Sequence, residues 1–208
     1  MKKILLLTLL VASVAFAKSA PRTHDGLFIN GSLGLGYGNY LDEYKNDGLK
    51  LQSEGVQIEG GFKIGFAIIP NLILHGTISL NAFASEIKAT NKYGEQTSLV
   101  LEDDELLETV LLGGGLTYYI PGESNIYLSA SLGLAKFTEF AFIGIKISEH
   151  DPALGFNLSV GKEWWVNNEL GVGVALSYKQ ASTKSKLGNY KGDSSFRTIS
   201  AVASVTFN

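Results

Sequence analysis

Residues 56–68 read VQIEGGFKIGFAI, and this stretch alternates between two kinds of side chain. Val56, Ile58, Phe62 and the other even-numbered positions are apolar apart from Gly60, whereas the odd-numbered positions are polar, charged or small. Successive side chains of a strand point to opposite faces, so the stretch predicts a strand with one apolar and one polar face. A helix would repeat its apolar residues every three or four positions instead.

Seven further segments alternate in the same way. They cover residues 27–37, 72–81, 109–120, 126–135, 154–161, 170–178 and 198–207. Short connectors with Pro, Gly or Asn lie near residues 69–71, 121–124 and 167–168, while long ones cover 40–55, 85–107, 138–153 and 182–195. None of the four prolines falls within an expected strand, as ladder hydrogen bonding requires. The pattern predicts eight antiparallel strands joined alternately by short and long connectors.

The first 17 residues, MKKILLLTLLVASVAFA, have the form of a secretory signal peptide. Two lysines precede an apolar run from Ile4 to Phe16, and Ala15 and Ala17 form a cleavage site. The alternative is a membrane anchor, but the run is shorter than the roughly 20 residues that span a bilayer as a helix. We therefore expect a signal peptide over residues 1–17, a periplasmic leader over 18–25 and one barrel domain over 26–208.

The composition excludes several classes of function. The chain has 208 residues with 17 Lys plus Arg against 20 Asp plus Glu, and loss of Lys2 and Lys3 with the signal peptide leaves 15 against 20, a net charge of −5. Such a balance lacks the basic footprint of a nucleic-acid-binding protein. Because the chain has no Cys, it has no thiolate nucleophile, Cys-based zinc site or disulfide. We expect no cofactor.

The residue types on the two faces decide which face is inside. The polar face consists largely of Gly, Ser, Thr and Ala, which suit a narrow interior better than a solvated outer surface. The apolar face then contacts lipid, and closure of the sheet satisfies the backbone polar groups. We predict an all-β, eight-stranded antiparallel up-and-down transmembrane β-barrel with short periplasmic turns and four long extracellular loops. The alternative is a soluble periplasmic β-protein with its apolar face inward, as in a lipocalin.

Aromatic residues gather near the predicted strand ends, as in the interfacial girdles of membrane barrels. The expected girdle residues are Tyr37, Phe66, Tyr118, Trp164, Tyr178 and Phe207, and we place Tyr40 with the extracellular set. Ordinary strand aromatics are the alternative explanation.

Five ionisable residues are expected to face the lumen: Glu59, Lys63, His75, Glu163 and Lys179. Charges inside a narrow barrel must be paired, so we interpret them as a structural polar network. The functional alternative is a gate or proton-linked site at His75, because histidine titrates near neutral pH. The other two histidines, His24 in the leader and His150 in the third long connector, are expected to be solvated.

Two weaker patterns lie in the long connectors. Glu102, Asp103, Asp104 and Glu105 supply oxygen ligands for weak Ca²⁺ or Mg²⁺ binding, although they lack the order of an EF-hand loop, and a solvated acidic loop is the alternative. Ser148, Glu149 and His150 are the only neighbouring set that could serve a barrel enzyme acting on lipid A. Adjacent loop residues do not make a triad, so we expect no catalytic activity and no metal centre.

Residues 26–208 resemble the family of small outer-membrane β-barrels that includes the OmpX, OmpA-barrel and OmpW types. The resemblance rests on the eight alternating segments, on GKEWWVNNELGVGVALSY at residues 161–178, and on the closing AVASVTFN. It implies a place in the outer membrane of a Gram-negative-type bacterium, in contact with lipid and lipopolysaccharide. It also implies that the outer-membrane assembly machinery recognises the strand from Ile199 to Phe207, although Asn208 follows the terminal aromatic residue.

The interior of an eight-stranded barrel is just wide enough for side chains to fill it. We therefore expect a structural or surface-interaction protein whose loops meet a ligand or another cell. The barrel is expected to be monomeric, because a closed barrel has no unpaired edge. The alternative is a narrow channel for small or hydrophobic molecules. The alternation in the third connector predicts that it continues as a hairpin, and the apolar residues that carry it are Phe140, Phe142, Ile143, Ile145 and Ile147.

Overall fold

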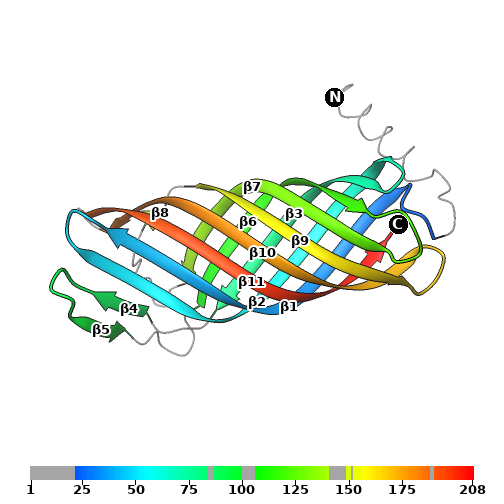
Figure 1. Ribbon diagram of the computed structural model, residues 1–208. Coiled ribbons are helices and arrows are strands. Elements are labelled where there is room, and N and C mark those ends of the chain that lie inside the picture. Colours follow the sequence, from blue (N-terminus) through cyan, green and yellow to red (C-terminus); the bar gives the residue numbers. More distant parts are fainter. Residues whose placement is uncertain (1–21, 84–86, 100–105, 141–148, 151, 188–189) are drawn as a thin grey trace, which may run out of the picture.

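Alternating side chains along the chain produce long strands that close into a barrel (Figure 1). The structure is a computed structural model, and it describes residues 22–83, 87–99, 106–140, 149–150, 152–187 and 190–208. The eight barrel strands are β1 (Leu27–Tyr44), β2 (Leu49–Ile69), β3 (Leu72–Phe83), β6 (Leu106–Tyr119), β7 (Ile126–Phe140), β9 (Ala153–Trp165), β10 (Leu170–Leu187) and β11 (Tyr190–Phe207).

The first and last strands close the sheet. Ile29 of β1 pairs with Ile64 of β2 on one side and with Phe207 of β11 on the other, and both pairings are antiparallel. The ring of neighbours is β1-β2-β3-β6-β7-β9-β10-β11. The predicted eight-stranded antiparallel barrel is therefore confirmed.

The two ends of the barrel differ. At one end, tight turns join β2 to β3, β6 to β7 and β9 to β10, and both the beginning of β1 and the end of β11 lie there (Figure 1). We call it the short-turn end, and the opposite end the hairpin end. Asn71 and Asn125 have positive φ values of 68° and 47°, which suits the tight turns in which they lie.

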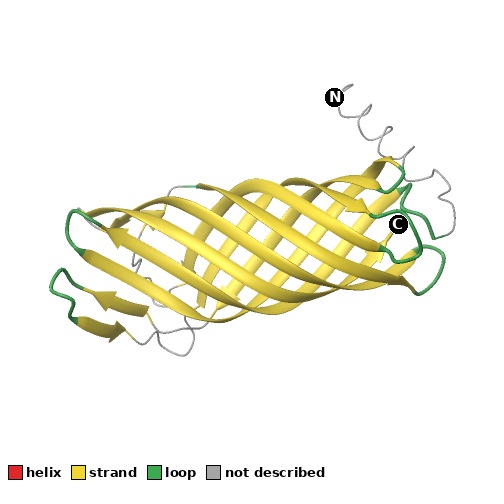
Figure 2. Ribbon diagram, in the orientation of Figure 1, coloured by secondary structure: helices red, strands yellow, loops and turns green. Residues whose placement is uncertain are grey.

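Two of the four long connectors consist mostly of strand. β1 and β2 extend as a hairpin around residues 45–48, and β10 and β11 extend around residues 188–189 (Figure 2). Gly48 has φ +63°, and a Cβ there would lie 2.4 Å from Lys92 Cβ. The alternation continues along β1 and β2, where Tyr44 and Leu51 are buried, but charged or polar residues such as Glu43, Lys50 and Glu54 replace most of the outward apolar ones.

Three short strands belong to the other connectors. β4 (Ile87–Thr90) pairs with residues 50–53 of β2 and forms a hairpin with β5 (Gln96–Leu99), while β8 (Glu149–His150) pairs with β10. The hairpin expected from the alternation of Phe142, Ile145 and Ile147 lies outside the described residues. In the part of the chain that is described, no helix is long and apolar enough to cross a membrane.

The apolar face points outward and the small polar face points into the lumen. Leu33 is 65% exposed, and every barrel strand carries large apolar side chains that are exposed on this outer face. Ser, Thr and Asn side chains on the other face are buried. A soluble barrel has the reverse arrangement, so the lipocalin-like alternative does not hold.

Candidate functional site: the barrel lumen

Side chains fill the lumen in three layers. The lower cluster, near the short-turn end, consists of Phe28, Ile73, Tyr119 and Tyr127. The upper cluster, nearer the hairpin end, consists of Tyr40, Leu111, Ala135, Ala153, Ala181 and Phe196. Along β1, β6 and β7 the inward residues between the two clusters are small or polar, for example Asn30, Thr117 and Ser129, while Glu163 lies beside Tyr119 of the lower cluster. The lumen therefore has an apolar closure on each side of a polar layer.

Glycine on the lumen face allows the lower cluster to pack. The Tyr127 ring lies against Gly161, where a Cβ would be 2.6 Å from ring atom Cζ and from the hydroxyl oxygen. Any larger residue at this position would displace the ring.

A buried ion pair crosses the upper half of the polar layer. Lys179 Nζ of β10 lies 3.0 Å from Glu59 Oε1 of β2, and the two side chains are only 3% and 5% exposed. Lys179 also donates to Asn81 Oδ1 at 2.9 Å and to Ser79. Gln57 joins this group by accepting from Asn81 at 2.6 Å. The group thus connects β2, β3 and β10.

A chain of hydrogen bonds runs through the lower half. His75 Nε2 lies 3.1 Å from Thr117 Oγ1, Thr117 donates to Ser129 Oγ at 2.8 Å, and Lys63 Nζ donates to the same Ser129 Oγ at 2.8 Å. Two hydroxyls therefore link the histidine to the lysine.

Glu163 has its own partners. Its Oε2 accepts from the Tyr119 hydroxyl at 3.0 Å and its Oε1 from Thr206 Oγ1 at 2.6 Å. The structure thus places all five predicted lumen residues on the inner face. It pairs two of them directly, joins two through hydroxyls and holds the fifth with a tyrosine. The two lysines and two glutamates balance in charge.

Little space remains between these side chains. A cavity of about 30 Å³ lies in the polar layer, and the residues that line it include Asn30, Glu59, Lys63 and Asn157. A cavity of this size holds about one or two water molecules. This cavity, among the residues that the structure describes, is too small to serve as a path for a solute.

His24 is not solvated, contrary to the sequence-based expectation. The side chain is 3% exposed, and its ring stacks on Tyr119 with 3.4 Å between centroids and 9° between planes. Trp165 lies at 5.0 Å, and the side-chain amide nitrogen of Asn208 lies 2.7 Å from Nδ1. The alternation pattern could not report this position because His24 precedes the first strand.

Tyr40 is a second correction. It is buried in the upper cluster instead of facing lipid. Even-numbered residues of β1 point inward and odd-numbered ones outward, so Tyr37 and Tyr40 lie on opposite faces. The sequence contained this signal, because residues three apart in a strand never share a face.

The predicted girdle residues lie on the outer wall. Phe66, Tyr118, Trp164 and Phe207 lie near the short-turn ends of their strands, whereas Tyr37 and Tyr178 lie midway along β1 and β10, which continue into the hairpins. Five of them are exposed, while Tyr178 is partly buried and donates its hydroxyl to Gln180 Oε1 at 2.8 Å. The exposed five are Tyr37, Phe66, Tyr118, Trp164 and Phe207.

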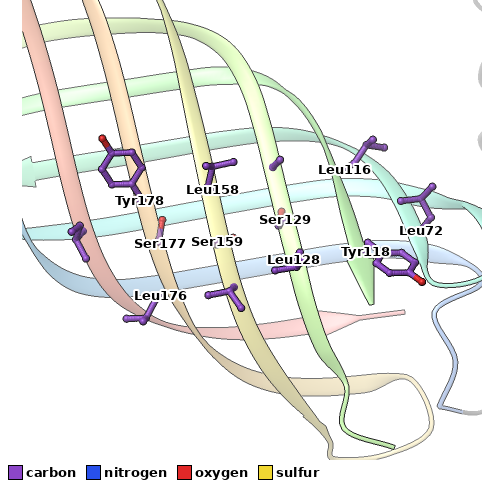
Figure 3. A pocket seen from close by; sticks show the side chains of 13 residues that line it. Leu72, Leu116, Tyr118, Leu128, Ser129, Leu158, Ser159, Leu176, Ser177 and Tyr178 are labelled. Atoms are coloured by element: carbon purple, nitrogen blue, oxygen red, sulfur yellow. The ribbon is translucent and has the colours of Figure 1, made fainter. Parts of the chain in front are cut away.

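A shallow apolar groove of about 650 Å³ also lies on the outer wall (Figure 3). Leucine side chains of β6, β7, β9 and β10 border it, with Tyr118 and Tyr178 at its edges. Ala130, which is smaller than the leucines around it, lies in this groove. The groove is part of the band of outward apolar side chains on the barrel wall, and no reactive side chains come together in it.

The remaining candidates lie at the hairpin end. Glu102, Asp103, Asp104 and Glu105, the possible cation ligands, lie outside the described residues, as does Ser148. Glu149 and His150 form β8, in which they pair with Lys186 and Ser185. No group of three His, Cys, Asp or Glu residues suited to a metal ion occurs among the residues that the structure describes.

Solved structures share this architecture. No protein-family model and no curated protein matches the chain. The outer membrane protein OprG from Pseudomonas aeruginosa has a TM-score of 0.58 and 13% sequence identity, over 89% of this chain and 97% of that one. The outer membrane protein AlkL, solved in lipid bilayers, has a TM-score of 0.52 and 13% identity, over 92% of this chain and 94% of that one. The chain therefore has the fold of the small eight-stranded outer-membrane β-barrels.

Proposed function

We propose that this protein is an integral outer-membrane barrel that anchors extracellular hairpins for contact with other molecules and carries out no catalysis. The observation that carries the proposal is the filled lumen: apolar clusters lie above and below a polar layer that holds a buried ion pair. In this proposal the exposed apolar belt contacts outer-membrane lipid and lipopolysaccharide, and the protein is monomeric.

Two further features support a role at the surface. The β1–β2 extension has a small core of its own, in which Tyr44 and Leu51 pack with Ala89 of the β4–β5 hairpin. Ser194 of β11 donates to buried Asp42 of β1, and this hydrogen bond connects the β1–β2 hairpin to the β10–β11 hairpin. Such internal contacts hold the projecting hairpins in a fixed arrangement, as an interaction surface requires.

The proposal includes export and assembly. Residues 1–17 act as the cleaved signal peptide, with 18–25 as leader and 26–208 as the barrel domain. The assembly machinery binds the strand from Ile199 to Phe207, in which outward Val205 and Phe207 alternate with inward polar residues.

Bilayer conductance separates the anchor from a channel. We expect purified, refolded protein to add no measurable conductance to a planar bilayer, and liposomes that contain it not to swell in small sugars. Discrete conductance steps, or uptake of a hydrophobic solute above that of empty liposomes, would contradict the anchor role and support the narrow channel instead.

Single cysteines test the orientation, because the chain has none of its own. Tyr93, between β4 and β5, is 77% exposed, and Glu123 is exposed at the short-turn end. We expect a membrane-impermeant maleimide to label Tyr93→Cys on intact cells and to label Glu123→Cys only after lysis. The reverse pattern would invert the proposed orientation.

A further inference from the structure

The end of the leader crosses the short-turn mouth of the barrel. Arg22 donates its backbone N–H to the Asn168 carbonyl at 2.8 Å, and the His24 carbonyl accepts from the Asn71 N–H at 3.0 Å. The Gly26 carbonyl accepts from the Ala67 N–H at 3.0 Å. These bonds attach residues 22–26, which we call the cap, to two different turns of the barrel.

The cap inserts one side chain into the mouth. The His24 ring lies between the backbone of the cap and the lower cluster, stacked on Tyr119 and next to Trp165. The side chain of Asn208, directly after β11, contacts the ring from the last strand. His24 therefore has partners on β6 and β9 and at the end of β11, and it is the buried contact between the cap and the lumen.

This position disfavours a charged imidazole. Burial lowers the pKa of His24 from 6.5 to about 4, although contacts with Asn125 and Asn208 and the charge of Asp25 act in the opposite direction. The ionisable groups next to the ring are Asp25 in the cap and Tyr119 on β6, whose hydroxyl is bound to Glu163 of β9.

We propose that residues 22–26 form a pH-sensitive cap, in which neutral His24 seats on Tyr119 and its protonation releases the cap from the barrel mouth. Release of the cap exposes buried Tyr119 to water on the periplasmic side and increases the exposure of Trp165, which is partly buried when the cap is seated, while the strand ladder and the polar layer stay in place. The device controls whether the lower cluster is covered at the short-turn mouth, and it is separate from the surface role of the hairpins.

Proton binding to His24 is linked to release of the cap, and this linkage determines the direction and the upper limit of the pH effect. Released His24 binds a proton below its ordinary pKa of 6.5, whereas seated His24 does so only below about 4. The seated state is therefore favoured fully above pH 6.5 and progressively less between pH 6.5 and about 4. Over that window the ratio of seated to released cap falls by at most roughly 300-fold, or two and a half powers of ten.

The two tryptophans of the chain allow a local measurement. Trp164 faces outward, so Trp164→Phe keeps an aromatic ring in the girdle and leaves Trp165 as the only indole. Acrylamide, which is dissolved in water, then reports the exposure of Trp165 in refolded protein. We expect the quenching constant to rise as the pH is lowered from 7.5 to 4, and the heat-modifiable gel shift to show that the barrel remains closed.

Two substitutions assign the response to His24. In the same background, His24→Phe keeps a ring for stacking and His24→Gln keeps a polar partner for Asn208, and neither titrates. Both are expected to give quenching that does not change with pH, whatever its level, whereas His150→Phe at the hairpin end keeps the full response. The proposal would be overturned if the quenching constant of the Trp164→Phe protein stayed the same down to pH 4. It would also be overturned if the rise at low pH persisted in either His24 variant.

Discussion

Replacing Lys179 by Met is expected to destabilise the barrel strongly. The substitution leaves the Glu59 carboxylate buried without its ion-pair partner and removes the donor to Asn81 and Ser79. Loss of one member of a buried pair costs about 3–5 kcal/mol, so the folding equilibrium should fall by roughly two to four powers of ten. Urea unfolding of protein refolded into lipid vesicles, followed by tryptophan fluorescence, measures this free energy.

Two comparisons make the test specific. Lys184→Met on the same strand removes an exposed pair with Asp193, and we expect its unfolding midpoint to match wild type. The double variant Glu59→Gln with Lys179→Met removes the charge of both partners, so it should recover most of the stability lost in Lys179→Met. A cost below about 1 kcal/mol for Lys179→Met, or no recovery in the double variant, would refute the account of a paired lumen.

Further predictions concern the packing and the hairpin end. Gly161→Ala places a methyl group against Tyr127 and should cost about 1–3 kcal/mol in urea unfolding, whereas outward Gly60→Ala meets open space and should change little; equal effects would contradict the packing. Lys184 lowers the pKa of Asp193, so this carboxyl should titrate below its usual range by carbon NMR and return to that range in Lys184→Met. Phe196→Ala opens the upper cluster and should cost about 3–5 kcal/mol, yet planar-bilayer conductance should stay absent because the lower cluster still closes the lumen.

The architecture could be predicted from the sequence because lipid imposes two simple requirements. Each strand must alternate, as residues 56–68 do, and every backbone polar group must be paired, which forces closure. The inward position of Glu59, Lys63, His75, Glu163 and Lys179 follows from counting by two along their strands.

The partners of these residues could not be predicted. Which inward side chains meet depends on the stagger between strands and on the width of the barrel, and alternation specifies neither. Glu59 therefore pairs with Lys179 across the lumen, and Glu163 lies with Tyr119 instead of Lys63 or His75. The extensions of the β1–β2 and β10–β11 hairpins could not be predicted either, because their outward side chains face water and need not be apolar.

The side-chain contacts inside the lumen join strands that are distant in the chain. Asn30 donates to Thr206 across 176 positions, Gln57 to Ser200 across 143 and Lys179 to Ser79 across 100. An incomplete sheet that lacks β10 leaves Glu59 without its ion-pair partner Lys179. Without β11, the side-chain amide of Gln57 loses the Ser200 hydroxyl to which it donates. Partly folded barrels inside the bilayer are therefore disfavoured until the β10–β11 hairpin is in place. The interior contacts thus make insertion and closure of the barrel one cooperative event.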